Sequence, residues 1–136
     1  METADKKRVL IVEDEEDVVT YLKYWFSDEG FEVETAGNGF EASEKTRTFK
    51  PDFITLDIVL PEKTGVNFYG EIKNNPETAN IPIIIITGLR DEFKNFIFNR
   101  RTAPPPDGYI SKPFDREKLL RTVWEVIGKK IVVATT

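Results

Sequence analysis

The sequence predicts a doubly wound α/β fold, in which five parallel strands alternate with five helices to form one layered domain. Two observations support the prediction. Short apolar runs that end on polar residues alternate along the chain with longer segments whose apolar residues recur at helical spacing. The chain has 136 residues, enough for one hydrophobic core and too few for two.

The predicted strands are short and mostly apolar, as expected where helices cover both faces of a parallel sheet. The clearest is a run of isoleucines at residues 83–86, because β-branched side chains favour strands. The second strand differs, since Phe31, Val33 and Thr35 alternate with polar residues. The five expected strands are residues 8–12, 31–36, 53–56, 83–86 and 109–110.

The predicted helices fill the segments between and after these strands. The first is expected to end at Gly30, a residue type that favours helix ends. The fourth must end by about Thr102, because the prolines at 104–106 cannot continue a helix. Asp115 is expected to cap the last helix. The helical patterns consist of Val18, Leu22, Trp25 and Phe26; residues 40–49; Val66, Tyr69 and Ile72; Leu89, Phe93, Phe96 and Ile97; and Leu119, Leu120, Val123 and Ile127.

The chain is expected to divide into an N-terminal tail at residues 1–7, a domain at 8–129 and a C-terminal segment at 130–136. The C-terminal segment contains the apolar residues 131–133, and three interpretations of it are open: a strand, a frayed end, or the start of a linker. The first ten residues lack a signal-peptide profile, and the apolar stretch 81–86 is too short to span a bilayer. We therefore expect a cytoplasmic protein without a membrane segment.

Composition excludes several kinds of chemistry. The net charge of −5 argues against non-specific nucleic-acid binding, which requires a basic surface. The sequence has no cysteine, which excludes disulfides and thiolate metal sites, and no histidine, which removes the commonest general base. Reactive groups must therefore be carboxylates, hydroxyls, lysines or backbone atoms.

Polar residues of these types follow four of the predicted strands. Glu13 and Asp14 follow the first, Asp57 the third, Thr87 the fourth and Lys112 the fifth. In doubly wound sheets, ligands bind at the carboxyl ends of the strands. Any one of these residues could be polar simply because strand ends meet solvent. Contact with solvent does not explain as well why acids, a hydroxyl and a lysine all lie at one edge of the sheet.

Three converging carboxylates repel one another unless a cation lies between them or one of them holds a proton. Oxygen ligands of this kind suit Mg²⁺, which binds one or two carboxylates and completes its shell with waters and phosphate. With Mg²⁺ to neutralise charge, Asp57 could attack phosphorus as a nucleophile. A lysine and a hydroxyl could then contact the phosphoryl oxygens.

Residues 8 to about 129 resemble the receiver domain of two-component response regulators. The similarity is carried by the acidic segment 9–15, the run 51–57 that ends on Asp57, Pro61 with Gly65, the pair Ile86–Thr87, and the segment 109–114 that contains Lys112, Pro113 and Phe114. The resemblance implies a flavodoxin-like (CheY-like) sheet with strand order 2-1-3-4-5. It also implies a role in phosphorelay signalling rather than enzymatic turnover.

The resemblance assigns the phosphoryl group and the metal to particular residues. Asp57 would accept phosphoryl from a histidine kinase or histidine phosphotransfer protein. Glu13, Asp14, Asp57 and the backbone carbonyl of Val59 would hold Mg²⁺. The only expected catalytic properties are Mg²⁺-dependent self-phosphorylation and autodephosphorylation.

The resemblance also implies a switch. Lys112 would pair with the phosphate, Thr87 would swing towards it, and Tyr109 would turn inward into the space vacated. Pro113 would follow a cis peptide bond. The change would reach the surface formed by the fourth helix, fifth strand and fifth helix, where an effector or a second copy of the chain could bind.

Three alternative functions compete with the interpretation as a phosphorylated receiver. The receiver fold could serve as a docking module that is never phosphorylated, although every expected site position is filled. A phosphatase with an aspartate nucleophile after the first strand would need a second aspartate two residues after Asp14, where Glu16 stands. A flavin-binding protein would need a phosphate loop in place of the acidic run 13–17, which repels phosphate.

Overall fold

The computed structural model describes residues 6–58, 65–88 and 106–135, with side chains up to Gly128. They form a five-stranded sheet in the order β2-β1-β3-β4-β5, in which every neighbouring pair is parallel. The predicted fold class and strand order are therefore confirmed. The strands are β1 (Arg8–Val12), β2 (Glu32–Ala36), β3 (Phe53–Leu56), β4 (Ile83–Thr87) and β5 (Gly108–Ser111).

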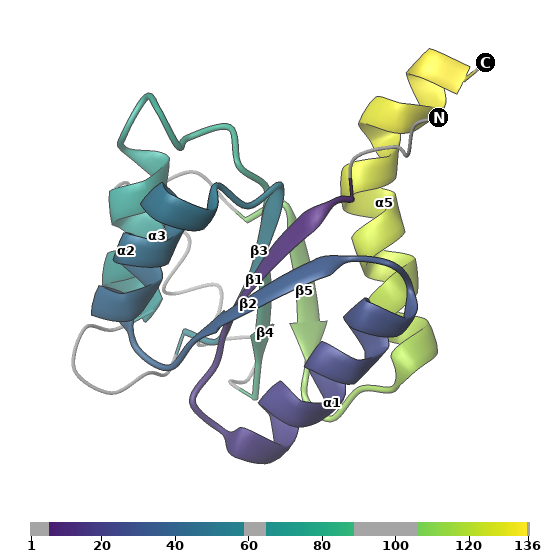
Figure 1. The fold of residues 1–136 in the computed structure, drawn as a ribbon, viewed down its shortest axis with the longest axis horizontal. Helices are drawn as coiled ribbons and strands as arrows, with labels where there is room; N and C mark the ends of the chain where they lie inside the picture. Colours follow the sequence, from purple (N-terminus) through teal and green to yellow (C-terminus); the bar gives the residue numbers. More distant parts are fainter. Residues whose placement is uncertain (1–5, 59–64, 89–105, 136) are drawn as a thin grey trace.

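Helices cover both faces of this sheet (Figure 1). Helices α1 (Glu16–Asp28) and α5 (Arg116–Thr135) lie on one face, and α2 (Gly39–Phe49) and α3 (Gly65–Lys73) lie on the other. The fourth predicted helix, at about 89–102, falls outside the described residues, as does most of the proline segment 103–106. Asp115 caps α5 as expected, since its Oδ1 accepts a hydrogen bond from the amide of Lys118 at 2.8 Å.

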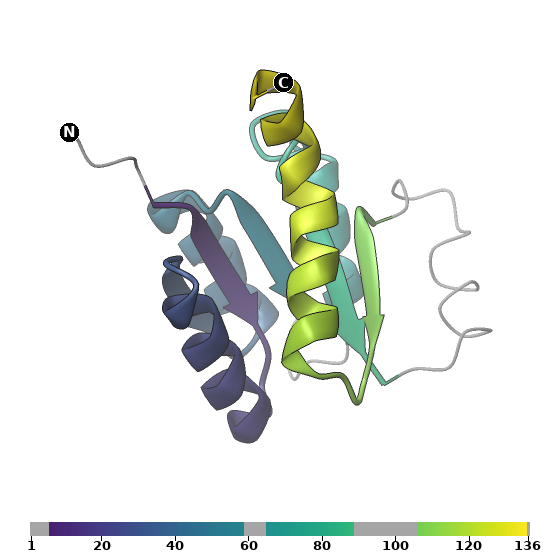
Figure 2. The same ribbon diagram turned by 90° about the vertical axis from the view of Figure 1, so that its right-hand side faces the viewer.

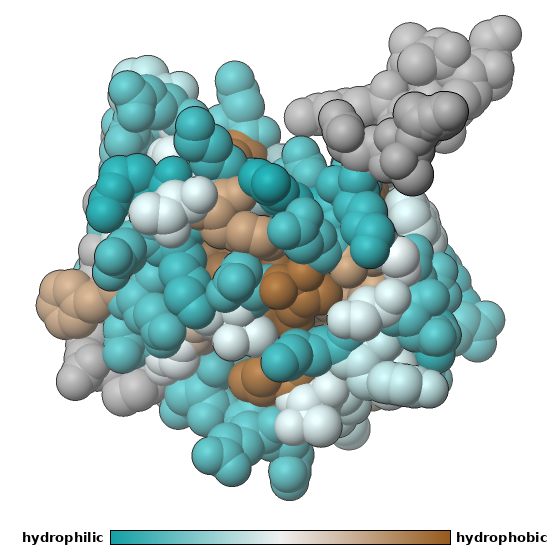
Figure 3. Space-filling model, in the orientation of Figure 1, coloured by the Kyte–Doolittle hydropathy of each residue, from teal (hydrophilic) through white to brown (hydrophobic). Residues whose placement is uncertain are grey.

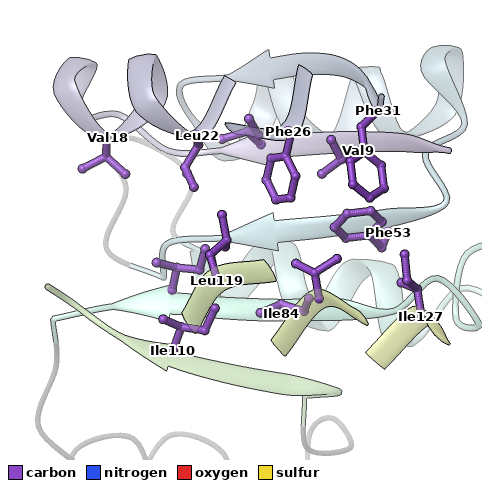
Figure 4. Packing of buried hydrophobic residues seen from close by; sticks show 13 residues of the cluster. Val9, Val18, Leu22, Phe26, Phe31, Phe53, Ile84, Ile110, Leu119 and Ile127 are labelled. Carbon is purple, nitrogen blue, oxygen red and sulfur yellow. The ribbon is translucent and has the colours of Figure 1, made fainter. Parts of the chain in front are cut away.

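The sheet separates two hydrophobic clusters. On the α1/α5 face, Phe26, Phe53 and Leu119 are completely buried with residues from β1, β4 and β5 (Figure 4). On the α2/α3 face, Leu10, Leu56 and Phe68 belong to the second cluster. Successive strand residues point to opposite faces, so β1 and β3 are buried on both sides and their sequences show no polar alternation.

The turn after α1 explains why Gly30 is required. Its φ of 94° is in the left-handed region that glycine adopts without a Cβ penalty. The Gly30 amide donates to Ser27 O at 3.0 Å and the Phe31 amide to Phe26 O at 3.0 Å, which is the hydrogen-bond pattern of a Schellman motif. The Phe26 and Phe31 rings also pack edge to face, with centroids 5.4 Å apart. The chain thus reverses direction and enters β2.

Strand β2 is one edge of the sheet, and its residues are less buried than those of the central strands. Glu32 is exposed and Glu34 is half-buried, and such charges discourage an edge strand from pairing with another chain. The view in Figure 3 shows a mostly hydrophilic surface, with hydrophobic atoms visible near its centre where β1 and β2 lie.

One sequence-based expectation was wrong in detail, and one open question is narrowed. Val66, assigned to the buried stripe of the third helix, is 36% exposed, and Phe68 is buried there with Tyr69 and Ile72. Of the three interpretations left open for the C-terminal segment, a strand is excluded, since α5 continues to Thr135 and extends past the sheet (Figure 2). The proposed division of the chain near residue 130 stays a prediction. Within the described ranges, no helix is long and apolar enough to cross a membrane.

Gly65 allows the start of α3 to pack against the backbone that follows β3. A Cβ at this position would lie 2.3 Å from Ile58 Cα and 2.6 Å from Asp57 O, far inside van der Waals contact. The Gly65 amide donates to Ile58 O at 3.1 Å, which fixes the approach. The backbone at residues 57–58 is therefore held directly by α3.

Replacing Thr55 with valine should stabilise the protein by about 1 kcal/mol, as measured by urea unfolding. Thr55 is 1% exposed, and its hydroxyl has no hydrogen-bond partner among the described residues. Valine has nearly the same shape and removes the unsatisfied oxygen. Thr46→Val is the matched control, because the buried Thr46 hydroxyl donates to Ala42 O at 2.7 Å. A loss of stability in Thr55→Val as large as that in Thr46→Val would contradict the prediction.

Replacing Gly65 with alanine should destabilise the protein by about 2 kcal/mol or more, because the added methyl group forces backbone apart. The control is Gly70→Ala in the same helix, where the new Cβ would meet only Asn74 Nδ2 at 4.0 Å. That control should be neutral or stabilising, since alanine has the higher helix propensity. Equal unfolding midpoints for the two variants would show that the close approach at Gly65 is unimportant.

Candidate functional site

The site lies at the carboxyl ends of β1 and β3, where the order of the strands along the sheet reverses. Helices leave opposite faces of a doubly wound sheet at this point and open a crevice for ligands. Val12 and Leu56 are paired in neighbouring strands, so Glu13 and Asp57 both follow directly at the same edge. The Asp57 amide donates to Val12 O at 2.9 Å, and the Glu13 amide donates to Ala36 O at 2.9 Å. Backbone pairing thus places both acids.

Glu13, Asp14 and Asp57 converge, as predicted from their positions after two strands. Each offers a carboxylate oxygen, and these three oxygens lie within 4.8 Å of one another. Glu13 and Asp57 are buried, whereas Asp14 is exposed. Two buried carboxylates so close together repel strongly, and a positive charge nearby is needed to keep both ionised.

Lys112 supplies one such charge from the end of β5. Its Nζ lies 3.1 Å from Asp57 Oδ2, 3.2 Å from Glu13 Oε2 and 2.5 Å from Glu15 Oε1. Its backbone amide donates to Thr87 O at 3.0 Å, which continues the pairing of β5 with β4. The Lys112–Pro113 peptide bond is cis, as the resemblance implied.

Aromatic packing holds the segment after Lys112 against α1. The Phe114 ring lies edge to face with Tyr21, with centroids 5.8 Å apart, and with Trp25 at 6.4 Å. Tyr21 and Trp25 are themselves 4.7 Å apart, one helical turn from each other on α1. These contacts join the loop that carries Lys112 to the helix that begins at the acidic segment.

Burial and neighbouring charges shift the pKa values in this cluster in opposite directions. Burial raises the pKa of Glu13 to about 7, and the neighbouring Asp57 carboxylate adds to the rise while Lys112 opposes it. For Lys112, burial lowers the pKa, but the hydrogen bond to Glu15 and the charges of Asp57 and Glu13 outweigh it and leave the pKa raised. Lys112 therefore stays protonated, and one ammonium group faces more negative charge than it can balance.

The donor set suits a hard divalent cation. Mg²⁺ holds oxygen ligands at about 2.1 Å, so that ligands on its octahedral shell lie about 3–4 Å apart. The spacing of the three carboxylate oxygens, at most 4.8 Å, is close to that range. Because Asp14 is exposed and makes one side of the cluster accessible, waters or a phosphate oxygen could complete such a shell.

The remaining predicted site residues lie at the same edge or next to it. Thr87 is buried at the end of β4. Tyr109 is half-buried in β5, opposite Ile85, and packs against the α2/α3 cluster. Val59, expected to offer its carbonyl, lies outside the described residues. The roles of these residues stay predictions, although their placement agrees with them.

Glu15 is the site residue that sequence reasoning missed. It was part of the acidic run but received no role, because a residue after the metal-binding pair has no evident partner in the sequence. Its contact with Lys112 joins residues 97 positions apart. The available signal was the run of acids at residues 13–17, which does not indicate which of them pairs with Lys112.

Comparison with known proteins also indicates a receiver domain. The response regulator receiver domain family matches residues 9–124. The alkaline phosphatase synthesis transcriptional regulatory protein PhoP of Bacillus subtilis is 32% identical over 128 residues, which cover 94% of this chain and 51% of PhoP. The chain thus spans about half the length of that relative.

Two solved structures with similar folds are receivers. The chemotaxis response regulator CheY4 of Vibrio cholerae has a TM-score of 0.81 and 28% identity, covering 90% of this chain and 100% of CheY4. The receiver domain of sensor histidine kinase PA1611 from Pseudomonas aeruginosa has a TM-score of 0.78 and 25% identity, covering 91% of this chain and 99% of that domain. That structure has a magnesium ion coordinated in its active-site cleft.

The sheet order, the acidic cluster at its switch point and the family match over most of the chain agree with one another. The chain therefore belongs to the response regulator receiver family, the phosphorelay domains of two-component signal transduction.

Proposed function

We propose that this receiver works as a phosphorylation-controlled switch in which Asp57 is the phosphoryl acceptor. The observation that carries the proposal is the surroundings of its carboxylate. It is buried where β1 and β3 end, with oxygens of Glu13 and Asp14 within 4.8 Å and Lys112 Nζ at 3.1 Å. Nucleophilic carboxylates act where nearby positive groups stabilise the phosphoryl charge.

In the proposed reaction an Asp57 carboxylate oxygen attacks the phosphorus of a phosphohistidine on a partner protein. The new P–O bond forms as the P–N bond breaks, and the electron pair of that bond returns to the imidazole. The product on this chain is an acyl phosphate. A small donor such as acetyl phosphate would react in the same way, with acetate as the leaving group. Hydrolysis of the acyl phosphate would reset the switch.

Mg²⁺ is the proposed cofactor, held by Glu13, Asp14 and Asp57 together with the Val59 carbonyl. When bound, the ion would neutralise charge on the transferring phosphoryl group. Asp14 is the accessible member of the set, and the more buried Glu13 is oriented by its bond from the Glu15 amide at 3.2 Å. We assign the main direct ligation to Asp14 and a supporting role to Glu13.

Residues on β4 and β5 and directly after β5 are proposed to respond to the phosphoryl group. Lys112 would donate to a phosphoryl oxygen, and Thr87 would move to hydrogen-bond another. Tyr109, now half-buried against the α2/α3 cluster, would turn further inward. Pro113 would shape the loop that carries Lys112. A charge added at Asp57 would thereby alter the exposed surface around β5 and α5.

The proposed partners are a histidine kinase or histidine phosphotransfer protein upstream and an effector protein or domain downstream. A phosphorylation-dependent homodimer is also proposed, and gel filtration of the phosphorylated protein tests it. The competing function is a docking module that is never phosphorylated. Labelling by a phosphodonor separates the two, because only the switch requires a reactive Asp57.

Asp57→Asn should abolish Mg²⁺-dependent labelling by acetyl phosphate, because the amide oxygen is a far weaker nucleophile. The measurement is intact-protein mass spectrometry, which detects the mass of one phosphoryl group. Asp17→Asn is the control, since Asp17 is an exposed aspartate in the first turn of α1. Wild-type protein that remains unlabelled with Mg²⁺ present would favour the docking module instead.

Asp14→Asn should lower Mg²⁺ affinity about tenfold or more, because one full carboxylate charge next to a divalent cation is lost. Titration of tryptophan fluorescence is a practical measure, since Trp25 packs on the Phe114 loop beside the site. Asp17→Asn should leave the affinity nearly unchanged. Equal Mg²⁺ affinity in Asp14→Asn and wild type would remove Asp14 from the metal site.

A further inference from the structure

The N–H donors of the Lys112 ammonium group are matched in number by the carboxylates around it. A lysine carries three N–H donors, and Lys112 Nζ is within hydrogen-bond distance of three carboxylates, those of Glu13, Glu15 and Asp57. The proposed function requires Lys112 to donate to a phosphoryl oxygen as well. At least one of these three bonds must therefore be released.

The Glu15 carboxylate is not used to cap α1 and is directed to Lys112 instead. Glu15 is the N-cap residue of α1, a position where Ser, Thr, Asp or Asn usually accepts a hydrogen bond from the first turn and where glutamate is not a preferred residue. Its carboxylate makes no such bond. It instead reaches Lys112 at 2.5 Å, while its own amide donates to Glu13 Oε2 at 3.2 Å.

The exposed fractions of the three carboxylate side chains indicate which of them releases Lys112 most easily. The side chains of Glu13 and Asp57 are 2% and 7% exposed, whereas that of Glu15 is 59% exposed. A buried carboxylate that loses its partner stays desolvated, but an exposed one is solvated by water at once. Phosphorylation also converts the Asp57 carboxylate into an acyl group without its own charge. Glu15 is then the accessible competitor of the phosphoryl group for Lys112.

We propose that Glu15 is a competing counter-ion that occupies Lys112 before phosphorylation and opposes its transfer to the phosphoryl group. Glu15 is a positioning residue, because it acts through Lys112 and is not required to touch the phosphoryl group. Its negative charge at the mouth of the site also repels an anionic phosphodonor. This inference rests on the proposed function of Asp57, and it concerns how readily that site is charged.

The test compares Glu15→Gln with Glu16→Gln. Both remove one negative charge from the start of α1, but Glu16 makes no ion pair within the described part of the chain. With Mg²⁺ and acetyl phosphate, Glu15→Gln should be labelled about threefold faster or more than Glu16→Gln, the range expected for a partly exposed pair. Glu15→Asp, which keeps the charge on a shorter side chain, should lie between Glu15→Gln and wild type.

A second measurement needs neither Mg²⁺ nor a phosphodonor. The ammonium protons of Lys112 can be followed by nitrogen-15 NMR in uniformly labelled protein, with the signal assigned by its loss in Lys112→Arg. In Glu15→Gln these protons should exchange faster with water, because one of three carboxylates has been replaced by an amide. In Glu16→Gln their exchange should match the wild type.

The outcomes separate this inference from the proposed function. Wild-type protein that is not labelled at all would overturn the function of Asp57 and the inference with it. Wild-type labelling with equal rates for Glu15→Gln and Glu16→Gln would overturn the inference and leave the function standing. Unchanged Lys112 proton exchange in Glu15→Gln would show that the ion pair does not form in solution, and would also overturn the inference.

Discussion

The ion pairs between the Lys112 ammonium and the carboxylates around it are the interaction on which the site depends. Glu13 and Asp57 are buried next to each other, an arrangement that is unfavourable for two negative charges without compensation. Lys112 compensates in part, and it does so from the opposite end of the chain. The remaining excess of negative charge is what makes the site suited to a divalent cation and a transferring phosphoryl group.

The fold provides this arrangement through backbone pairing. Parallel strands bring the residues after β1, β3 and β5 to one edge of the sheet, and the reversal of strand order between β1 and β3 leaves that edge open. Gly65 brings α3 against the backbone of residues 57–58, and Phe114 anchors the Lys112 loop on α1. Elements on both faces of the sheet thus hold the same few side chains in place.

Much of this could be predicted from sequence, for reasons specific to each element. Strands buried on both faces leave continuous apolar runs, so β3 and β4 were evident, and the acids after β1 and β3 had to converge once the sheet was parallel. The buried side of α3 was misjudged, because Val66 fits the apolar spacing but faces outward. The Glu15–Lys112 contact could not be predicted, since it depends on side-chain reach between distant residues.

The central claim is that the phosphoryl group is carried by Asp57. The most direct measurement is to phosphorylate the wild-type protein with acetyl phosphate and Mg²⁺, reduce the acyl phosphate with borohydride, and sequence the peptides by mass spectrometry. Reduction converts a phosphorylated aspartate into homoserine. We expect homoserine at position 57 and at no other acid. Homoserine at Asp14 or another carboxylate, or none anywhere, would contradict the account.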